Sequence, residues 1–389
     1  MKIIFANRRN CLSSPGGDTV QMLKTIEYLK KNYNLDITIC LSPEEIINDK
    51  EASIVHIFNI QSIDATLELI KASKDSGKKV ALSPVYWDVS HSIYVYKMFQ
   101  LFNITSNIRY VKNFKNLVVK GAVLRGILPK GKINNSDSFA TQKYINTRRR
   151  ALIEADYILP NSNEEFDIIC REFNFKKEEL KHKIAVIPNA VDINQDNKGK
   201  ASIDRKANIL NEIKDFVLEV GRIEVNKNQY GVVKALFDRP EIPIVFIGRV
   251  SDNKVEKEYY EKLRELSEKR GNVFFINQIS QEEVFEYYKK AKVHVLPSFR
   301  ESPGLSSLEA LYFGCNIVTS DSEFCPVKYY KFDEKANTCN PYDYLSIRKA
   351  ILNAYSCPKN QGFDEEYFKY YSYDNVSSLM NEVYSKLSK

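Results

Sequence analysis

Short runs of consecutive apolar residues alternate with longer segments of helical periodicity in the first half of the chain. The runs predict strands at 2–6, 37–41, 54–58, 79–83, 156–159 and 184–187. Apolar residues three or four positions apart predict helices over 18–31 and 63–74. Strands that are apolar throughout and separated by helices are typical of a parallel sheet with both faces covered.

The same pattern begins again after a polar stretch at 194–206, which is typical of a linker. Strands are predicted at 216–220, 244–247, 273–276, 293–296 and 316–319, and helices near 227–236, 254–269, 281–290 and 304–313. A last helical pattern fills 363–389. The sequence therefore predicts an α/β protein with two doubly wound domains, 1–195 and 205–362, followed by a C-terminal helix.

Composition places the chain among globular proteins, and its 389 residues favour two domains over one. Its seven cysteines include no Cys-x-x-Cys pair, which argues against a zinc site or a disulfide framework and for a reducing compartment. The N-terminus enters the first strand without a signal-peptide core, and no apolar stretch approaches the roughly 20 residues that span a bilayer. We therefore expect a cytoplasmic protein, free or peripheral on the inner face of the membrane.

Positive charge is concentrated in one segment. The chain carries a net charge of +7, whereas residues 97–150 hold 12 Lys and Arg against a single acid, Asp137. Apolar residues are interleaved with these cations, which favours contact with an anionic membrane surface or with a lipid-pyrophosphate acceptor. The alternative is a solvated basic face over an ordinary core. Nucleic acid is not expected, because no binding motif accompanies the charge.

Two carboxylates lie between the strands at 293–296 and 316–319. Glu301 is on the loop, and Glu309 is inside a helix that opens near Gly304. Ligands of open α/β sheets bind past the carboxyl ends of strands, and helix N-termini attract anions. A carboxylate there can accept two hydrogen bonds from the vicinal diol of a ribose or a sugar ring. Taken alone, two glutamates at this spacing would be better explained as solvated charges of a helix and a loop.

Two glycine turns precede helices. Gly221-Arg222 ends the strand at 216–220, and Lys227 opens the next helix, so two cations lie where a diphosphate could bind. Gly16-Gly17 follows the first strand and would let backbone N–H groups approach a ligand, although such a pair is also an ordinary turn. Neither turn is a Gly-x-Gly-x-x-Gly fingerprint, so no nicotinamide cofactor is predicted.

At these residues the chain resembles a known family. Glu301 and Glu309, with Gly304-Leu305 between them, are similar to the Glu-x7-Glu motif of retaining glycosyltransferases, and more narrowly of family 4. That family has the GT-B fold, in which two Rossmann-like domains face a central cleft and the last helix crosses back onto the first domain. Where the family more often has Gly-Phe-Gly-Leu-Pro, this chain has Ser302 to Ser306.

The resemblance implies roles for the donor site. Arg222 and Lys227 would hold the diphosphate of a nucleotide sugar and stabilise it as it leaves, and Glu301 would orient the sugar hydroxyls. Glu309 would hold the ribose. Gly304, Leu305 and Ser306 would line the same site, and Gly16 and Gly17 would touch the phosphate from the first domain. No Asp-x-Asp motif occurs, which favours a metal-independent site in which cations and helix N-termini neutralise the diphosphate.

Further stretches resemble landmarks of the first domain. The turn at 187–192 is similar to a Pro-Asn-Gly-Val-Asp turn of the family, with Asn189 kept and Ala190 in place of glycine. Either Asp88 or His91, just past the strand at 79–83, would contact the transferred sugar. His56 and His294 lie inside apolar strands and are expected in the core.

The resemblance implies a hexosyltransferase that moves a sugar from a nucleotide-diphosphate donor, a UDP-sugar rather than a GDP-sugar, to an acceptor hydroxyl with retention of configuration. No other cofactor is expected, and the acceptor would be a lipid-linked cell-surface glycan. One alternative is a nucleotide-sugar 2-epimerase, which shares the fold and needs no acceptor. Another is a catalytically silent subunit that binds a sugar nucleotide or a membrane.

Overall fold

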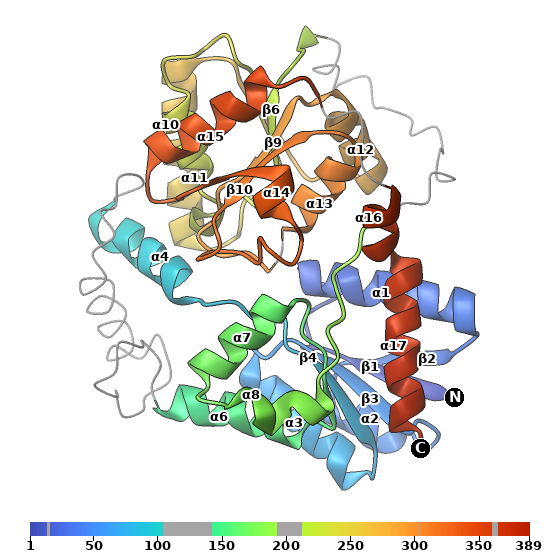
Figure 1. The fold of residues 1–389 in the computed structure, drawn as a ribbon. Coiled ribbons are helices and arrows are strands. Elements are labelled where there is room, and N and C mark those ends of the chain that lie inside the picture. The colour runs from blue at the N-terminus through green and yellow to red at the C-terminus, as the bar shows by residue number, and fades with distance from the viewer. Residues whose placement is uncertain (14–15, 104–141, 193–211, 303, 360–364) are drawn as a thin grey trace. The chain divides into compact units, whose positions relative to one another are not determined.

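The computed structural model describes residues 1–13, 16–103, 142–192, 212–302, 304–359 and 365–389 (Figure 1). They form two compact units. Unit 1 contains the described residues of 1–87, 142–192 and 366–389, and unit 2 contains those of 88–103 and 212–365.

Unit 1 is built on a five-stranded parallel sheet in the order β2-β1-β3-β4-β5. Its strands are β1 (Lys2–Ala6), β2 (Asp36–Cys40), β3 (Ile54–Phe58), β4 (Lys79–Ser83) and β5 (Tyr157–Ile158). Its helices are α1 (Gly17–Tyr33), α2 (Pro43–Asn48), α3 (Ile63–Asp75), α6 (Gln142–Glu154), α7 (Asn163–Glu172), α8 (Lys177–Leu180) and α17 (Tyr373–Leu387), with the short α16 (Glu365–Tyr370) leading into α17. This is the doubly wound arrangement that the sequence predicts.

Unit 2 repeats the plan with a six-stranded parallel sheet in the order β11-β10-β9-β6-β7-β8. Its strands are β6 (Val217–Val220), β7 (Ile244–Ile247), β8 (Val273–Ile276), β9 (Val293–Leu296), β10 (Asn316–Ser320) and β11 (Ala336–Cys339). Its helices are α4 (Ser90–Phe102), α10 (Gln229–Ala235), α11 (Lys254–Arg270), α12 (Gln281–Lys290), α13 (Leu305–Tyr312), α14 (Phe332–Lys335) and α15 (Tyr344–Ser356).

The predicted strands agree with the observed ones within two residues, with one exception. The segment 184–187 forms a single bridge, Ile184 to Ile158, and is not a strand. Its backbone follows β5 for a short distance, because the N–H of Ala185 bonds to the carbonyl of Ile158 at 3.1 Å. The edge of the sheet therefore ends with the two-residue β5.

The C-terminal helix α17 belongs to unit 1, where it packs along α1 (Figure 1). Tyr373 at its start stacks on Tyr28 of α1 with ring centroids 5.3 Å apart. Farther along, the buried hydroxyl of Tyr384 lies 2.7 Å from Nδ1 of His56, whose Nε2 lies 2.8 Å from Oγ of Ser83. Through His56, the helix α17 is connected to both β3 and β4. His56 is a core residue as expected, and its burial lowers its pKa to about 3.

Residues 88–102 are grouped with unit 2, whereas the predicted boundary put them in the first domain. The reason is aromatic packing. Tyr94 of α4 lies 6.2 Å from the ring of Tyr342, and Phe99 packs edge-on against Tyr259 of α11 at 5.6 Å. Burying these rings fixes α4 on unit 2.

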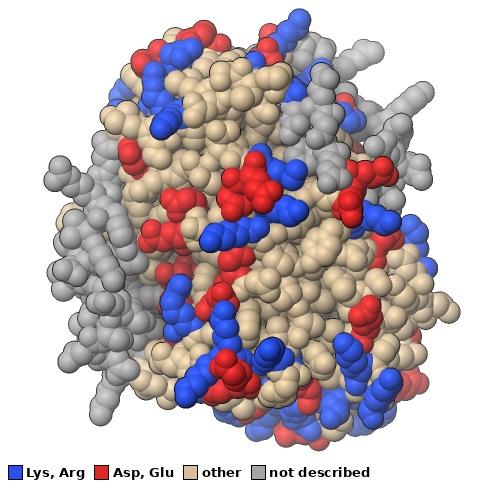
Figure 2. Space-filling view, viewed as in Figure 1, with Lys and Arg blue, Asp and Glu red and all other residues tan. Residues whose placement is uncertain are grey.

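The basic segment 97–150 lies mostly outside the described residues, and three of its described cations contribute to the fold. Lys97 and Arg148 are buried, and the guanidinium of Arg148 lies 3.5 Å from the centre of the Tyr144 ring. Arg149 donates to the carbonyl of Phe173 at 2.7 Å. On the face shown in Figure 2, the described basic and acidic side chains are interspersed. Among the helices that the structure describes, none is both long enough and apolar enough to cross a membrane.

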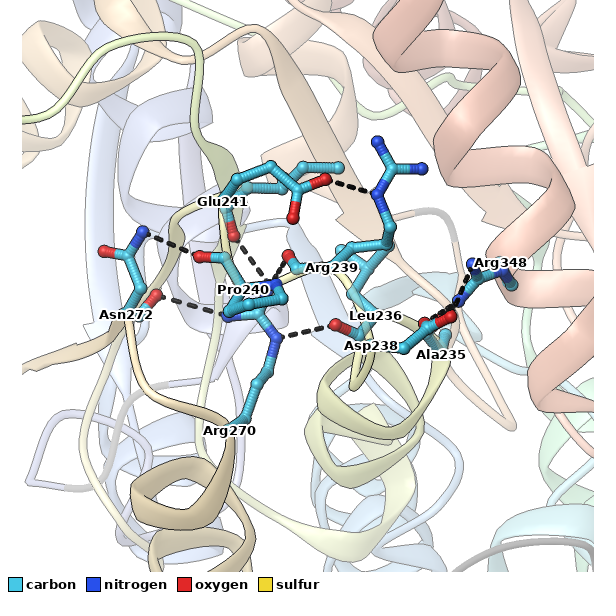
Figure 3. Close-up of polar contacts among 10 residues, drawn as sticks. Ala235, Leu236, Asp238, Arg239, Pro240, Glu241, Arg270, Asn272 and Arg348 are labelled. Atoms are coloured by element: carbon cyan, nitrogen blue, oxygen red, sulfur yellow. Dashed lines mark hydrogen bonds and ion pairs between the residues drawn. The ribbon is translucent and has the colours of Figure 1, made fainter.

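Arg270 binds the backbone of the segment between α10 and β7 in unit 2 (Figure 3). Its buried guanidinium, at the end of α11, donates to five backbone carbonyls: Leu236, Arg239, Ile242, Gly271 and Asn272, at 2.7–3.4 Å. Burial lowers its pKa to about 10, so it stays charged at neutral pH. The guanidinium supplies hydrogen-bond donors to backbone carbonyls of the loop between α10 and β7. Carbonyls that are buried without a donor would destabilise the fold.

We expect Arg270→Leu to destabilise the protein by about 3 kcal/mol, because several buried carbonyls lose their donor at once. Arg264→Leu is the matched control, since Arg264 is on the same helix but is exposed and paired with Glu268. Calorimetric melting of the two variants tests this. Equal melting temperatures for both would contradict the structural role of Arg270.

Tyr384→Phe should cost about 1–3 kcal/mol, because it leaves Nδ1 of His56 buried without its partner. The single tryptophan, Trp87, is buried in unit 1 and reports the unfolding of that unit by its fluorescence. Tyr33→Phe is the control, because Tyr33 lies at the margin of the same core. A urea midpoint for Tyr384→Phe that equals the control would show that the hydroxyl contributes nothing.

Candidate functional site

The loop that follows β6 is held rigidly against its neighbours. This β6 loop, residues 221–228, starts with Gly221, against whose backbone Gly248 at the end of β7 packs. A Cβ on Gly248 would lie 2.0 Å from the Gly221 carbonyl oxygen, and its φ of +153° also favours glycine. Glu256 of α11 accepts the N–H of Val225 at 2.7 Å, and burial raises its pKa to about 7.

A second loop, the β9 loop at residues 297–302, is bound to the first. Its Phe299 N–H donates to the Asn226 carbonyl at 2.9 Å, and Asn226 Nδ2 donates back to the Arg300 carbonyl at 3.2 Å. Asn228, in the left-handed conformation at φ 65°, donates to the Pro297 carbonyl at 3.2 Å. Because β6 and β9 are adjacent in the sheet, the two loops leave it at the same edge.

The two loops bring Lys227 and Glu301 together. The ammonium of Lys227 donates to Oε1 of Glu301, and only 16% and 10% of the two side chains are exposed. The two residues are 74 positions apart in the sequence. The pair is thus a largely desolvated ion pair at the carboxyl edge of the sheet, which is where ligands of this fold class bind.

Arg222 takes a different position. Its side chain is 51% exposed, and its guanidinium lies 3.3 Å from the carboxylate of Glu224, which is in the same loop. The loop holds the backbone of Arg222, since Gln229 Nε2 donates to its carbonyl at 3.0 Å. Its guanidinium can therefore swing while its backbone stays fixed.

Helix α13 carries the second glutamate of the predicted motif. It begins after Gly304, where a Cβ would lie 2.3 Å from the side chain of Leu296, so glycine permits this close approach. Leu305 and Ser306 form the first turn, in which backbone N–H groups have no helical partner. Glu309, one turn later, accepts from Gln281 Nε2 at 2.9 Å and from the Tyr288 hydroxyl at 3.1 Å.

Unit 1 brings its own predicted residues together. Gly16 and Gly17 start α1, and Gln21 of the same helix holds the turn that contains Asn189. The Gln21 side chain accepts the N–H of Ala190 at 3.2 Å and donates to its carbonyl at 2.9 Å. Asn189 is half-buried in that turn.

Asp88 lies just before α4 and His91 in its first turn, both in unit 2. Asp88 accepts the N–H of Ser90, the first residue of the helix, at 2.8 Å. His91 is buried, with Nδ1 3.0 Å from the Tyr342 hydroxyl and Nε2 3.1 Å from the carboxylate of Glu323. Both residues therefore also have structural partners on their own unit.

Several residues of the site were not predicted from the sequence. Gln281 and Tyr288 hold Glu309 from α12, and Glu256 braces the β6 loop from α11. Glu219 is buried in β6 itself. Only Glu219 had a visible signal, an acid within an apolar strand. The others look like ordinary helix residues until the fold brings them to the site.

Within the residues that the structure describes, no three His, Cys, Asp or Glu side chains are grouped so that they could share a metal ion. Positive charge at the site comes from Lys227 and Arg222.

Residues 201–373 match the family model described as "Glycosyl transferases group 1". The O-antigen chain mannosyltransferase RfbU of Salmonella typhimurium is 25% identical over 250 residues. The match covers 63% of this chain and spans 64% of the length of that relative.

Solved structures show the same fold over the whole chain. Sucrose-phosphate synthase from Thermosynechococcus elongatus has a TM-score of 0.68 at 15% identity, and covers 100% of this chain and 99% of its own. Anabaena HepE, in complex with UDP and glucose, has a TM-score of 0.65 at 14% identity, with 99% and 100% covered. The chain has the GT-B fold, and its residues 201–373 match the group 1 glycosyl transferases.

Proposed function

We propose that the protein is a retaining, metal-independent glycosyltransferase of the family 4 type. The observation that carries the proposal is the ion pair between Lys227 and Glu301, two largely buried groups at the carboxyl edge of β6 and β9. A cation that binds a diphosphate and a carboxylate that binds sugar hydroxyls are the two groups that a nucleotide-sugar site needs side by side. The match of residues 201–373 to group 1 glycosyl transferases supports the same activity.

Lys227 and Arg222 would bind the donor diphosphate. Lys227 is a compact charge at the edge of the sheet, and Arg222 has a half-exposed fork that can turn from Glu224 toward a phosphate. The first turn of α13, with Leu305 and Ser306, adds backbone N–H groups and the positive end of the helix. Gly16 and Gly17, at the start of α1, would contribute the same kind of donors from unit 1.

The two glutamates would bind the two sugars of the donor. Once Lys227 turns to the diphosphate, Glu301 is free to accept hydrogen bonds from hydroxyls of the transferred sugar. Glu309 would bind the ribose diol, and Gln281 and Tyr288 hold its carboxylate in place. Asp88 or His91 would make a further contact with the transferred sugar, and Asn189 would line the acceptor side.

In the reaction we propose, the bond between the anomeric carbon and the phosphate oxygen breaks, and an acceptor hydroxyl forms the new bond on the same face. The departing phosphate oxygen takes the hydroxyl proton, so no protein nucleophile takes part. Lys227 and Arg222 would stabilise the charge that develops on the leaving phosphate. Such preorganised charges are the main source of rate enhancement in transfer reactions.

For the donor we propose a UDP-sugar, and for the acceptor a lipid-linked cell-surface glycan at the cytoplasmic membrane face. HepE has been crystallised with UDP-glucose, and RfbU is named an O-antigen chain mannosyltransferase. A further structural relative, at a TM-score of 0.58, is the lipopolysaccharide outer core galactosyltransferase WaaB. These names support a role in polysaccharide synthesis.

The first test is a thermal-shift series with UDP, GDP, ADP and CMP in the presence of a chelator. A nucleotide at 100 times its dissociation constant should stabilise the wild type by about 2.7 kcal/mol. We expect UDP to do so, and Glu309→Ala to lose the shift because the ribose loses its acceptor. Glu268→Ala, an exposed change on α11, is the control and should keep the shift.

A thermal shift with GDP alone would mean that the donor is a GDP-sugar rather than a UDP-sugar. No shift with any nucleotide would exclude the donor site and favour a silent subunit. If UDP binds and the protein releases a free epimerised sugar from its donor without an acceptor, the 2-epimerase is the better assignment.

The ion pair predicts opposite effects for its two partners on the binding of UDP, measured by titration calorimetry. Lys227→Met should weaken binding by about 10- to 100-fold, because a charge-assisted contact is lost. Glu301→Gln should bind UDP at least as tightly as the wild type, because the lysine no longer has a competing carboxylate. Weaker binding by both variants to the same degree would indicate a purely structural pair.

A further inference from the structure

Glu219 is an acidic side chain in the interior of unit 2. It lies on β6, two residues before Gly221, and is only 1% exposed. Neither of its carboxyl oxygens has a partner among the residues that the structure describes. Buried polar groups are almost always paired, so an orphaned carboxyl directly behind a binding edge requires a reason.

The groups that act on Glu219 belong to the candidate site. Lys227 and Glu301 are the two charges that act on its carboxyl, and Glu219 in turn acts on the hydroxyl of Tyr259 of α11. The neighbouring strand contributes the fully buried His294, on which the charge of Lys227 also acts. Neither ring nitrogen of His294 has a hydrogen-bond partner within the described part of the chain. In the sheet, Glu219 pairs with Phe246 of β7, which carries no charge.

Burial shifts the pKa values of this group of residues. Burial raises the pKa of Glu219 well above its ordinary value, and the opposing effect of Lys227 is smaller. Burial also lowers the pKa of His294 to about 3 and raises the pKa of Tyr259 above its usual range. Burial therefore favours the neutral form of Glu219, His294 and Tyr259 alike, and among the residues that the structure describes Glu301 is the carboxylate that accepts from Lys227.

We propose that Glu219 is a positioning residue for Lys227, one that decides whether the lysine is released to a donor diphosphate or retained by two carboxylates. This rests on the proposed diphosphate site. With Glu219 neutral, an incoming diphosphate competes with Glu301 for the lysine. With Glu219 ionised, both carboxylates would attract the lysine, and both would repel the diphosphate.

The inference predicts a pH dependence of donor binding that belongs to Glu219. The probe is UDP, or GDP if the thermal-shift series selects it, titrated calorimetrically from pH 7 to pH 9.5. Relative to Glu219→Gln, the wild type should lose at least about 10-fold in affinity over this range, which corresponds to about 1.4 kcal/mol. Because the ionisation of the nucleotide is common to both proteins, their ratio isolates the protein group.

Glu256→Gln is the matched control. Glu256 is also a buried glutamate of the site with a raised pKa, of about 7, but it bonds to the Val225 N–H and faces Arg222 and Glu224 rather than Lys227. Glu256→Gln should therefore keep the loss of UDP affinity at alkaline pH that Glu219→Gln removes. Glu219→Leu has no titratable group at this position, so its UDP affinity should depend on pH as little as that of Glu219→Gln.

A second readout needs no nucleotide. The native state retains a proton on Glu219 that the unfolded chain gives up above pH about 4.3, so wild-type stability falls as pH rises through that value toward the native pKa. Glu219→Gln should therefore melt at a higher temperature, by about 2–4 °C at pH 8, and the gap should shrink toward pH 4.

The outcomes separate the two proposals. If the wild type binds no nucleoside diphosphate, the proposed function fails and the role of Glu219 with it. If the wild type binds UDP but the UDP affinities of the wild type and Glu219→Gln change equally from pH 7 to pH 9.5, only the positioning role is overturned. An unchanged melting temperature at pH 8 would also overturn it, since Glu219 would then be ionised in the native state.

Discussion

The pairing of Lys227 with Glu301 is the constraint on which the candidate site of unit 2 depends. Lys227 is mostly buried, and an isolated ammonium in such a place would be costly. Glu301 neutralises it in the free protein. In the proposed function, a ligand with two phosphates would take over that neutralising role and would free a carboxylate to accept from a sugar. Stability and function would then draw on the same charge.

The exchange requires loops that do not collapse when the ion pair opens. The β6 loop and the β9 loop satisfy this through backbone contacts that do not involve the pair, such as Phe299 N–H to the Asn226 carbonyl. Gly248 adds a steric constraint, because its missing Cβ lets β7 press against Gly221. With the backbone fixed, only the side chains of Lys227 and Arg222 need to move. A rigid backbone that carries a few movable charged side chains is typical of a preorganised site.

The likeness to solved structures at 11–15% identity shows how few residues such a fold requires. Apolar strands, helices between them, and glycines at close approaches are sufficient to specify two parallel sheets. The helix residues that brace the loops follow none of these local patterns. Gln281, Tyr288 and Glu256 belong to this set.

The sequence by itself determined the two α/β units, nearly all strand positions, and the pairing of a glycine turn with two glutamates downstream. These features are local, because hydrophobic periodicity and turn residues act within a few positions of each other. The tertiary structure alone decided that α4 packs on unit 2, that segment 184–187 is not a strand, and that Gln281 holds Glu309. It also decided that Glu219 lies unpaired beside Lys227. Each of these depends on contacts between residues far apart in the chain, and burial and field strength exist only once those contacts have formed.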